Sequence, residues 1–145
     1  MRSRMIHEAD GLRVYAAVLD IGDEAMACLT RLAADERLTA AQVTAIGAFE
    51  SATLAFFDWE TKEYEKIPVR EQVEVLSLTG DMTLGEDGGP KLHLHAVLGR
   101  RGGATLGGHL LEARVRPTLE VIVNESPAHL RRAHDARSGL ALIRL

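Results

Sequence analysis

Three of the six histidines in this chain, His93, His95 and His109, are spaced so that they could act together as metal ligands. Apolar and polar residues alternate between positions 92 and 98, which is the period-two pattern of a β-strand with one face in the core. His93 and His95 would project from the other face, with their Cα atoms roughly 6.6 Å apart. The residues expected to face the core are Leu92, Leu94, Ala96 and Leu98.

The third histidine belongs to the next expected strand. Residues 100–103, Arg-Arg-Gly-Gly, predict a turn, because glycine tolerates positive φ. A hairpin centred near Gly102 places His95 opposite His109, and directly opposed side chains have Cβ atoms about 4.5–5.5 Å apart. A β-bulge at Gly107-Gly108 would alter this register. In either arrangement the three imidazoles can converge on one point.

Three converging imidazoles have a specific chemical use. Neutral imidazole is a good ligand for Zn²⁺, and three protein ligands with one open coordination position are usual in catalytic zinc sites. Such a site could activate water or hold a small, oxygen-rich acid. The alternative is that the histidines are ordinary polar residues on a solvated strand face. No clear general base accompanies them, so the pattern predicts no reaction and leaves open whether the chain is an enzyme.

Glu120 interrupts an otherwise apolar strand, and a carboxylate there needs a polar partner. One interpretation gives it an ion pair with Arg114 or Arg116. The other places it beside the metal, where it would orient a ligand histidine or a metal-bound water. Glu112 and Glu50 are weaker candidates of the same kind.

The histidines lie in two motifs, P-x-L-H-L-H at residues 90–95 and G-G-H-L-L-E at residues 107–112. With these motifs the chain resembles a stand-alone prokaryotic member of the PPC (plants and prokaryotes conserved) domain family. The resemblance covers nearly the whole chain. Further matching stretches lie at residues 45–50, 73–80, 119–121 and 135–140.

The resemblance implies a small α+β domain around a mixed, largely antiparallel sheet, usually assembled as a homotrimer. It implies that His93, His95 and His109 form a zinc site like that of some prokaryotic members. The fold is similar to that of acetolactate decarboxylase, an enzyme with a three-histidine zinc site, although fold alone is poor evidence for a reaction. The family is also linked to DNA binding, chiefly through plant members with a separate AT-hook. The plant motif G-R-F-E-I-L lacks its leading Gly-Arg at residues 71–76 here.

The length of the chain predicts one domain, residues 1–145, and the resemblance implies that it is of the α+β class. The main helix is expected at residues 23–35 with Asp23 as its N-cap. Ser126-Pro127 predicts a short C-terminal helix that ends near His134. The other strands are expected at residues 12–19, 42–57, 64–69, 73–82, 115–123 and 140–145.

The formal net charge of −4 does not by itself favour phosphate binding. An aromatic content of 4% weakens any mode that relies on base stacking, and no Arg-Gly-Arg-Pro core of an AT-hook is present. DNA binding, the competing function, is therefore expected to be weak and to use Arg100, Arg101, Arg131 and Arg132. A third alternative is an interaction module whose histidines bind nothing.

The single cysteine, Cys28, excludes an intrachain disulfide, and its helical surroundings predict a buried thiol. No apolar run approaches the length of a transmembrane helix, and the N-terminus lacks the apolar region of a signal peptide. We therefore expect a cytoplasmic protein without membrane association.

Overall fold

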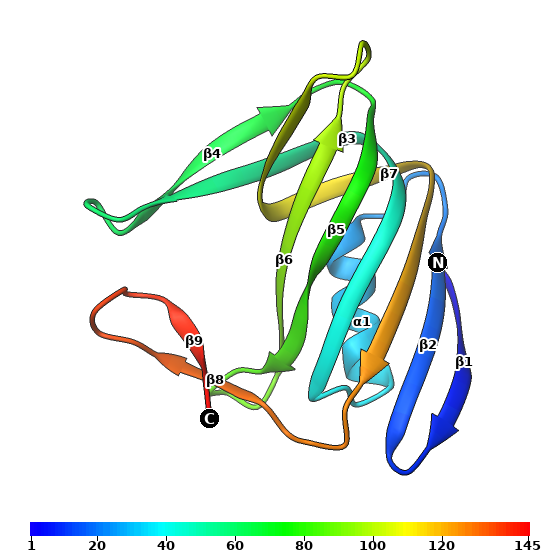
Figure 1. Ribbon diagram of the computed structural model, residues 1–145, viewed down its shortest axis with the longest axis vertical. Helices are drawn as coiled ribbons and strands as arrows, with labels where there is room; N and C mark the ends of the chain where they lie inside the picture. The colour runs from blue at the N-terminus through cyan, green and yellow to red at the C-terminus, as the bar shows by residue number, and fades with distance from the viewer.

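A computed structural model describes all residues, 1–145, as nine β-strands and one α-helix. Figure 1 shows a strongly twisted sheet with the helix against one of its faces. The elements in chain order are β1 (Arg2–Ala9), β2 (Leu12–Leu19), α1 (Ala25–Asp35), β3 (Ala40–Asp58), β4 (Glu63–Val69), β5 (Val73–Leu84), β6 (Pro90–Gly99), β7 (Thr105–Glu125), β8 (Arg131–His134) and β9 (Ala141–Arg144).

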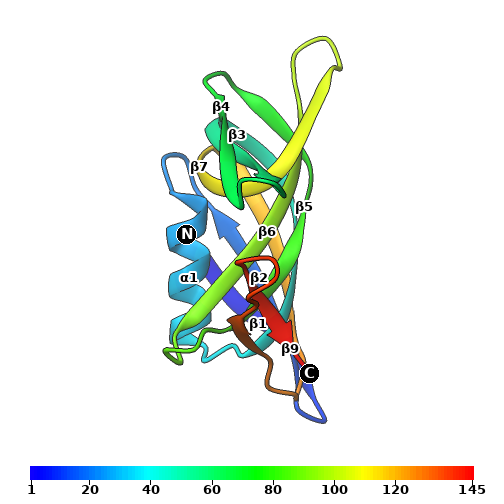
Figure 2. The same cartoon turned by 90° about the vertical axis from the view of Figure 1, so that its left-hand side faces the viewer.

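The pairings of four strands form a closed cycle. β3 pairs with β5, β5 with β6, β6 with β7, and β7 again with β3, all antiparallel. β1 and β2 extend the sheet from β7, while β8 meets β5 in the one parallel contact and carries β9. The sheet is therefore mixed and largely antiparallel, as expected, and β6 lies between β5 and β7 (Figures 1 and 2).

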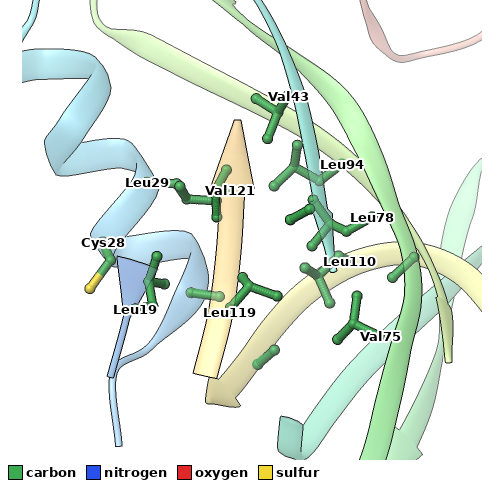
Figure 3. Close-up of a cluster of buried hydrophobic side chains, with 14 of the residues drawn as sticks. Leu19, Cys28, Leu29, Val43, Val75, Leu78, Leu94, Leu110, Leu119 and Val121 are labelled. Atoms are coloured by element: carbon green, nitrogen blue, oxygen red, sulfur yellow. The ribbon is translucent and has the colours of Figure 1, made fainter. Parts of the chain in front are cut away.

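The leucine face of β6 lies in the core, as its alternating pattern predicted. Leu94, Ala96 and Leu98 are buried, whereas His95 and Val97 on the other face are exposed. Figure 3 shows Leu94 among buried side chains from the neighbouring strands β5 and β7. These neighbours include Val75, Leu78 and Leu110.

A glycine on β5 allows β6 to come this close. Gly80 pairs with Leu94, and a Cβ atom added to Gly80 would lie 1.9 Å from the carbonyl oxygen of His93. Any side chain at position 80 would therefore push the histidine strand away from β5.

Helix α1 covers one side of this core and contacts β6 and β7. Leu29 packs beside Leu19 and Val121, and Cys28 is buried, as expected (Figure 3). The N-cap is Glu24 rather than the predicted Asp23, because the Glu24 carboxylate accepts the backbone N–H groups of the first turn. The helix spans eleven residues, and the molecule contains no helix long and apolar enough to cross a membrane.

The structure has no C-terminal helix, so that prediction was wrong. The fold is mainly β rather than α+β, since it contains one helix and nine strands. The backbone after Ser126-Pro127 bonds to neighbouring strands instead of to itself. Leu130 donates its N–H to the Thr39 carbonyl and accepts from the N–H of Leu84. Arg131 then pairs with Leu84, so tertiary hydrogen bonds override the local capping signal.

The outer half of β3 and the whole of β4 form a two-stranded arm, residues 52–69, that projects from the body of the molecule (Figure 1). Phe56, Phe57, Trp59 and Tyr64 belong to it, which is four of the six Phe, Trp and Tyr residues in the chain. The arm therefore concentrates the few aromatic side chains on one projecting element. The hairpin predicted for this segment, with its polar tip, is confirmed.

Candidate metal centre

The three histidines meet on the face of β6 and β7 that points away from the core. His95 and His109 are direct cross-strand partners, and Ala96 and Val97 continue this ladder opposite Gly108 and Gly107 without a bulge. The predicted register is therefore confirmed. One potential ligand nitrogen from each of His93, His95 and His109 lies within 4.8 Å of the other two.

The imidazole rings form a compact triangle. The ring centroid of His93 lies 5.0 Å from that of His95 and 5.1 Å from that of His109. The ring centroids of His95 and His109 are 5.4 Å apart. The Nε2 atoms of His93 and His95 are 3.1 Å apart. Two donors at 2.0–2.1 Å from one tetrahedral ion stand roughly 3.3 Å apart, so this spacing suits shared coordination.

Burial keeps two of the rings neutral. Desolvation, with the neighbouring His93 and His95 as further causes, lowers the pKa of His109 to about 4. Desolvation also lowers the pKa of His93, helped by the positive charge of Arg132. A neutral imidazole is the form that binds a metal, so the cluster is prepared for coordination at neutral pH.

One buried nitrogen in the cluster has no partner. The Nδ1 atom of His109 is buried and makes no hydrogen bond. Buried polar atoms are nearly always satisfied, and an unsatisfied one calls for a missing ion or water. Together with the neutral donors and their spacing, this orphaned atom shows that the residues fit a metal ion.

Tyr64 on the arm covers the cluster from the side. Its ring stacks on His109 with centroids 4.9 Å apart, and Phe57 packs against Tyr64 edge-on at 5.3 Å. The arm therefore contributes an aromatic wall to the site. Tyr64 was not predicted as a site residue, because its contact with His109 depends on two strand pairings, β4 with β3 and β3 with β7.

A partly buried ion pair supports the site from the other side. Arg132 on β8 binds both carboxylate oxygens of Asp81 at 2.7 and 2.9 Å and lies 3.2 Å from Nδ1 of His93. Asp81 is the cross-strand partner of His93 on β5. Asp81 was not predicted as a site residue, although its alternation with core residues of β5 places it on the histidine face.

A small cavity of about 190 Å³ opens beside the histidines. Its charged side chains are Lys91 and Arg132, and no carboxylate lines it. The remaining lining residues are Tyr64, Leu92, His93, His109, Leu140, Ala141 and Leu142. The cavity thus has one metal-binding and cationic side and one apolar side, and the C-terminal strand β9 forms part of the apolar side.

Glu120, Glu112 and Glu50 are not brought to the cluster. Glu120 is exposed near Ile46 and makes no hydrogen bond or ion pair with a histidine, with Arg114 or with Arg116. Glu112 accepts the hydroxyl of Thr53, and Glu50 pairs with Arg116. Neither interpretation of Glu120 is therefore supported, because solvent at the strand surface satisfies its carboxylate.

The four arginines proposed to contact DNA do not form one patch. Arg100 and Arg101 occupy the β6–β7 turn, where Arg100 pairs with Glu71. Arg131 and Arg132 lie on β8, beside the opposite end of β6 (Figure 1). Arg132 is also buried, so it cannot reach a phosphate.

Several solved structures resemble this chain over nearly its whole length. A metal-containing protein from Archaeoglobus fulgidus is 34% identical with a TM-score of 0.84, covering 91% of this chain and 93% of its own. A plant- and prokaryote-conserved protein from Pyrococcus horikoshii is 29% identical with a TM-score of 0.86, covering 97% and 98%. A candidate DNA-binding protein from Ralstonia eutropha is 31% identical with a TM-score of 0.84, covering 90% of each chain.

The resemblance to acetolactate decarboxylase is limited to the fold. A Staphylococcus aureus protein of unknown function, similar to alpha-acetolactate decarboxylase, is 15% identical with a TM-score of 0.52. It covers 77% of this chain and 51% of its own. No curated protein matches the chain. The family model of the Plants and Prokaryotes Conserved (PCC) domain matches residues 6–127, and the chain therefore belongs to this family.

Proposed function

We propose that this protein binds a divalent metal ion, zinc, through His93, His95 and His109. The observation that carries the proposal is the convergence of three imidazole nitrogens within 4.8 Å of one another. Two supporting facts are the unpartnered Nδ1 of His109 and the similarity to the metal-containing protein from Archaeoglobus fulgidus. Three protein ligands leave one coordination position open, as in catalytic zinc sites.

The open position would take a small organic acid. Three neutral ligands leave the full charge of the ion uncompensated, whereas Lys91 and Arg132 at the cavity are already paired with Asp87 and Asp81. An anionic oxygen is the group that this charge attracts, while Leu92, Leu140 and Leu142 would contact a short apolar tail. The proposal is of binding, and it assigns no reaction.

Metal analysis of protein purified without a histidine tag tests the proposal, with calorimetric zinc titration of metal-free protein at neutral pH as its companion. We expect close to one zinc ion per chain and saturable binding. Protein that contains no metal and takes up no zinc would contradict the proposal and leave an interaction module as the better explanation.

We also propose that the protein assembles as a homotrimer, in line with the resemblance stated above. Ile46, Leu76 and Ile122 support this, because these large apolar side chains are 61%, 53% and 39% exposed on one face of the sheet. They surround shallow depressions there together with Glu120. Burial between chains would remove this apolar surface from water.

DNA binding is the second candidate function. Its support is the similarity to a candidate DNA-binding protein from Ralstonia eutropha. We expect any such binding to be weak, because the net charge is −4 and the arginines on β8 are separated from those in the β6–β7 turn. The contacts would be to phosphates, without base readout.

A further inference from the structure

We propose that Asp81 and Arg132 are positioning residues for His93 that act in opposite directions: Asp81 favours the metal-binding tautomer of the ring, and Arg132 favours the other tautomer. The inference rests on the proposed metal function and explains what sets the affinity of the histidine cluster for zinc. It follows from the hydrogen bonds around one side chain.

Arg132 is held rigidly. Its side chain is 8% exposed, and each of its nitrogens has a partner. Nε donates to the hydroxyl of Thr83 at 3.2 Å, and Nη1 donates to the carbonyl of Ala141 at 2.8 Å. Nη2 donates to Asp81 and lies 3.2 Å from Nδ1 of His93. The guanidinium therefore cannot turn away without breaking several bonds at once.

The direction of the bond to His93 is fixed by chemistry. A guanidinium only donates hydrogen bonds, so Nδ1 of His93 must accept. The proton of the neutral ring is then on Nε2, which lies 3.1 Å from Nε2 of His95 and donates to it. Arg132, His93 and His95 thus form a chain of hydrogen bonds that is complete without a metal.

Coordination by Nε2 of His93 requires the opposite tautomer. The lone pair on Nε2 must be free, so the ring proton must move to Nδ1, where it needs an acceptor. Asp81 is the cross-strand neighbour of His93 and the carboxylate bound to the same guanidinium nitrogen. Asp81 makes no hydrogen bond to His93 in the structure, but its carboxylate lies on the same Arg132 nitrogen as Nδ1 of His93, and we assign it as the acceptor of that proton. Arg132 instead presents a second donor and a positive charge to Nδ1.

The residue that opposes coordination lies in the C-terminal hairpin. Arg132 is on β8, beyond residue 127, where the match to the family model ends. The hairpin also carries Ala141, whose carbonyl helps to fix the guanidinium. The C-terminal hairpin, which lies beyond the residues matched by the family model, therefore tunes the affinity of the histidine cluster.

Two measurements test this inference. Long-range ¹H–¹⁵N spectra of metal-free protein with labelled histidine report which ring nitrogen carries the proton. Wild type should show His93 protonated on Nε2, and Arg132→Met, which keeps an apolar stem without donors, should shift the ring toward the Nδ1–H form. Zinc affinity is then measured by competition with a chromophoric chelator.

The two substitutions should change zinc affinity in opposite directions. Arg132→Met should bind zinc roughly tenfold more tightly, the order expected for removing one nearby positive charge. Asp81→Asn should bind it about 10–100-fold more weakly, as outer-partner changes usually do. Thr83→Val removes another partner of Arg132 without touching His93, and it should leave the affinity within about twofold of wild type.

Weaker binding in both Arg132→Met and Asp81→Asn would show that the ion pair only stabilises the structure, and would overturn the inference. So would a wild-type ring protonated on Nδ1 in the metal-free state, a result that needs no variant to fold. Absence of zinc binding by wild type would overturn the proposed metal function as well, which distinguishes the two failures.

Discussion

His95 and His109 face each other across the β6–β7 ladder, with ring centroids 5.4 Å apart. This pairing depends on strand register, because a slip by one residue would turn one of the two side chains to the opposite face of the sheet. Since the leucine face of β6 is buried, such a slip would also expose the core. The forces that stabilise the core therefore also align the histidines.

His95→Ala should abolish zinc binding and leave the fold intact. His95 is exposed and neighbours both other histidines, so its loss leaves two ligands without the third that zinc sites require. The loss of affinity should exceed the ~10–100-fold that outer-partner changes cause. Calorimetric zinc titration and circular dichroism measure the two effects.

His7→Ala is the matched control, since His7 is an exposed histidine on β1, away from the cluster. It should bind zinc as wild type does. Equal affinity in His95→Ala and wild type would exclude His95 as a ligand.

Metal-free protein should lose stability as the pH falls from about 6.5 toward 4. The pKa of His109 is lowered to about 4 in the folded state, so between these values the unfolded chain binds more protons than the folded one. Unfolding free energy therefore rises with pH through this window. Allowing for the partial exposure of the ring, the change is on the order of 2 kcal/mol.

Urea denaturation of chelator-treated protein across this pH range measures the effect. His109→Gln removes the titrating group, so its unfolding free energy should vary less with pH than that of wild type. Identical pH profiles for the two proteins would show that His109 titrates normally in the folded state.

Much of the fold and the candidate site could be predicted from local patterns. The period-two alternation of β6, the turn at Gly102 and the register of His95 with His109 are local properties of one hairpin, and the structure confirms them. The C-terminal helix was wrong because Leu130 and Arg131 bond to distant strands, which a capping signal cannot reveal.

The remainder of the site depends on contacts between segments that are distant in sequence. Arg132 reaches Asp81 and His93 across 51 and 39 positions, respectively. Tyr64 reaches His109 through two strand pairings, because Ala55 of β3 pairs with His109 of β7 and the nearby Phe57 pairs with Tyr64 of β4. Glu120 was a candidate because it interrupts an apolar strand, but its side chain faces solvent on another part of the sheet.

Tyr64→Ala should bring the pKa of His109 back toward the ordinary imidazole value. The tyrosine ring stacks on His109 and shields it from water, and desolvation is the main cause of the lowered pKa. The stack itself is worth about 1 kcal/mol of unfolding free energy. NMR titration of the histidine side chains measures the pKa.

Tyr64→Phe keeps the ring and removes only the hydroxyl, so it should titrate as wild type does. A His109 pKa that is unchanged in Tyr64→Ala would mean that the arm does not shield the site in solution.

DNA binding, where it is detectable, should be weak and should disappear as salt is raised. Phosphate contacts alone give affinities that fall steeply with ionic strength and carry no sequence information. Arg101→Ala in the exposed β6–β7 turn should weaken it equally for unrelated duplexes in fluorescence anisotropy titrations. Sequence-specific binding at nanomolar affinity in physiological salt would contradict this prediction.

Leu76→Glu should convert the proposed trimer into monomers. Leu76 lies with Ile46 on the apolar face described above, and a carboxylate buried between chains would carry a large desolvation cost. Ile21→Glu is the matched control, because Ile21 is 68% exposed but lies in the turn before α1, away from that face. Light scattering after size-exclusion chromatography should report a trimer for wild type and Ile21→Glu, and a monomer for Leu76→Glu. A wild type that remains monomeric at every concentration would contradict the trimer, and a trimeric Leu76→Glu would place its interface on another face of the sheet.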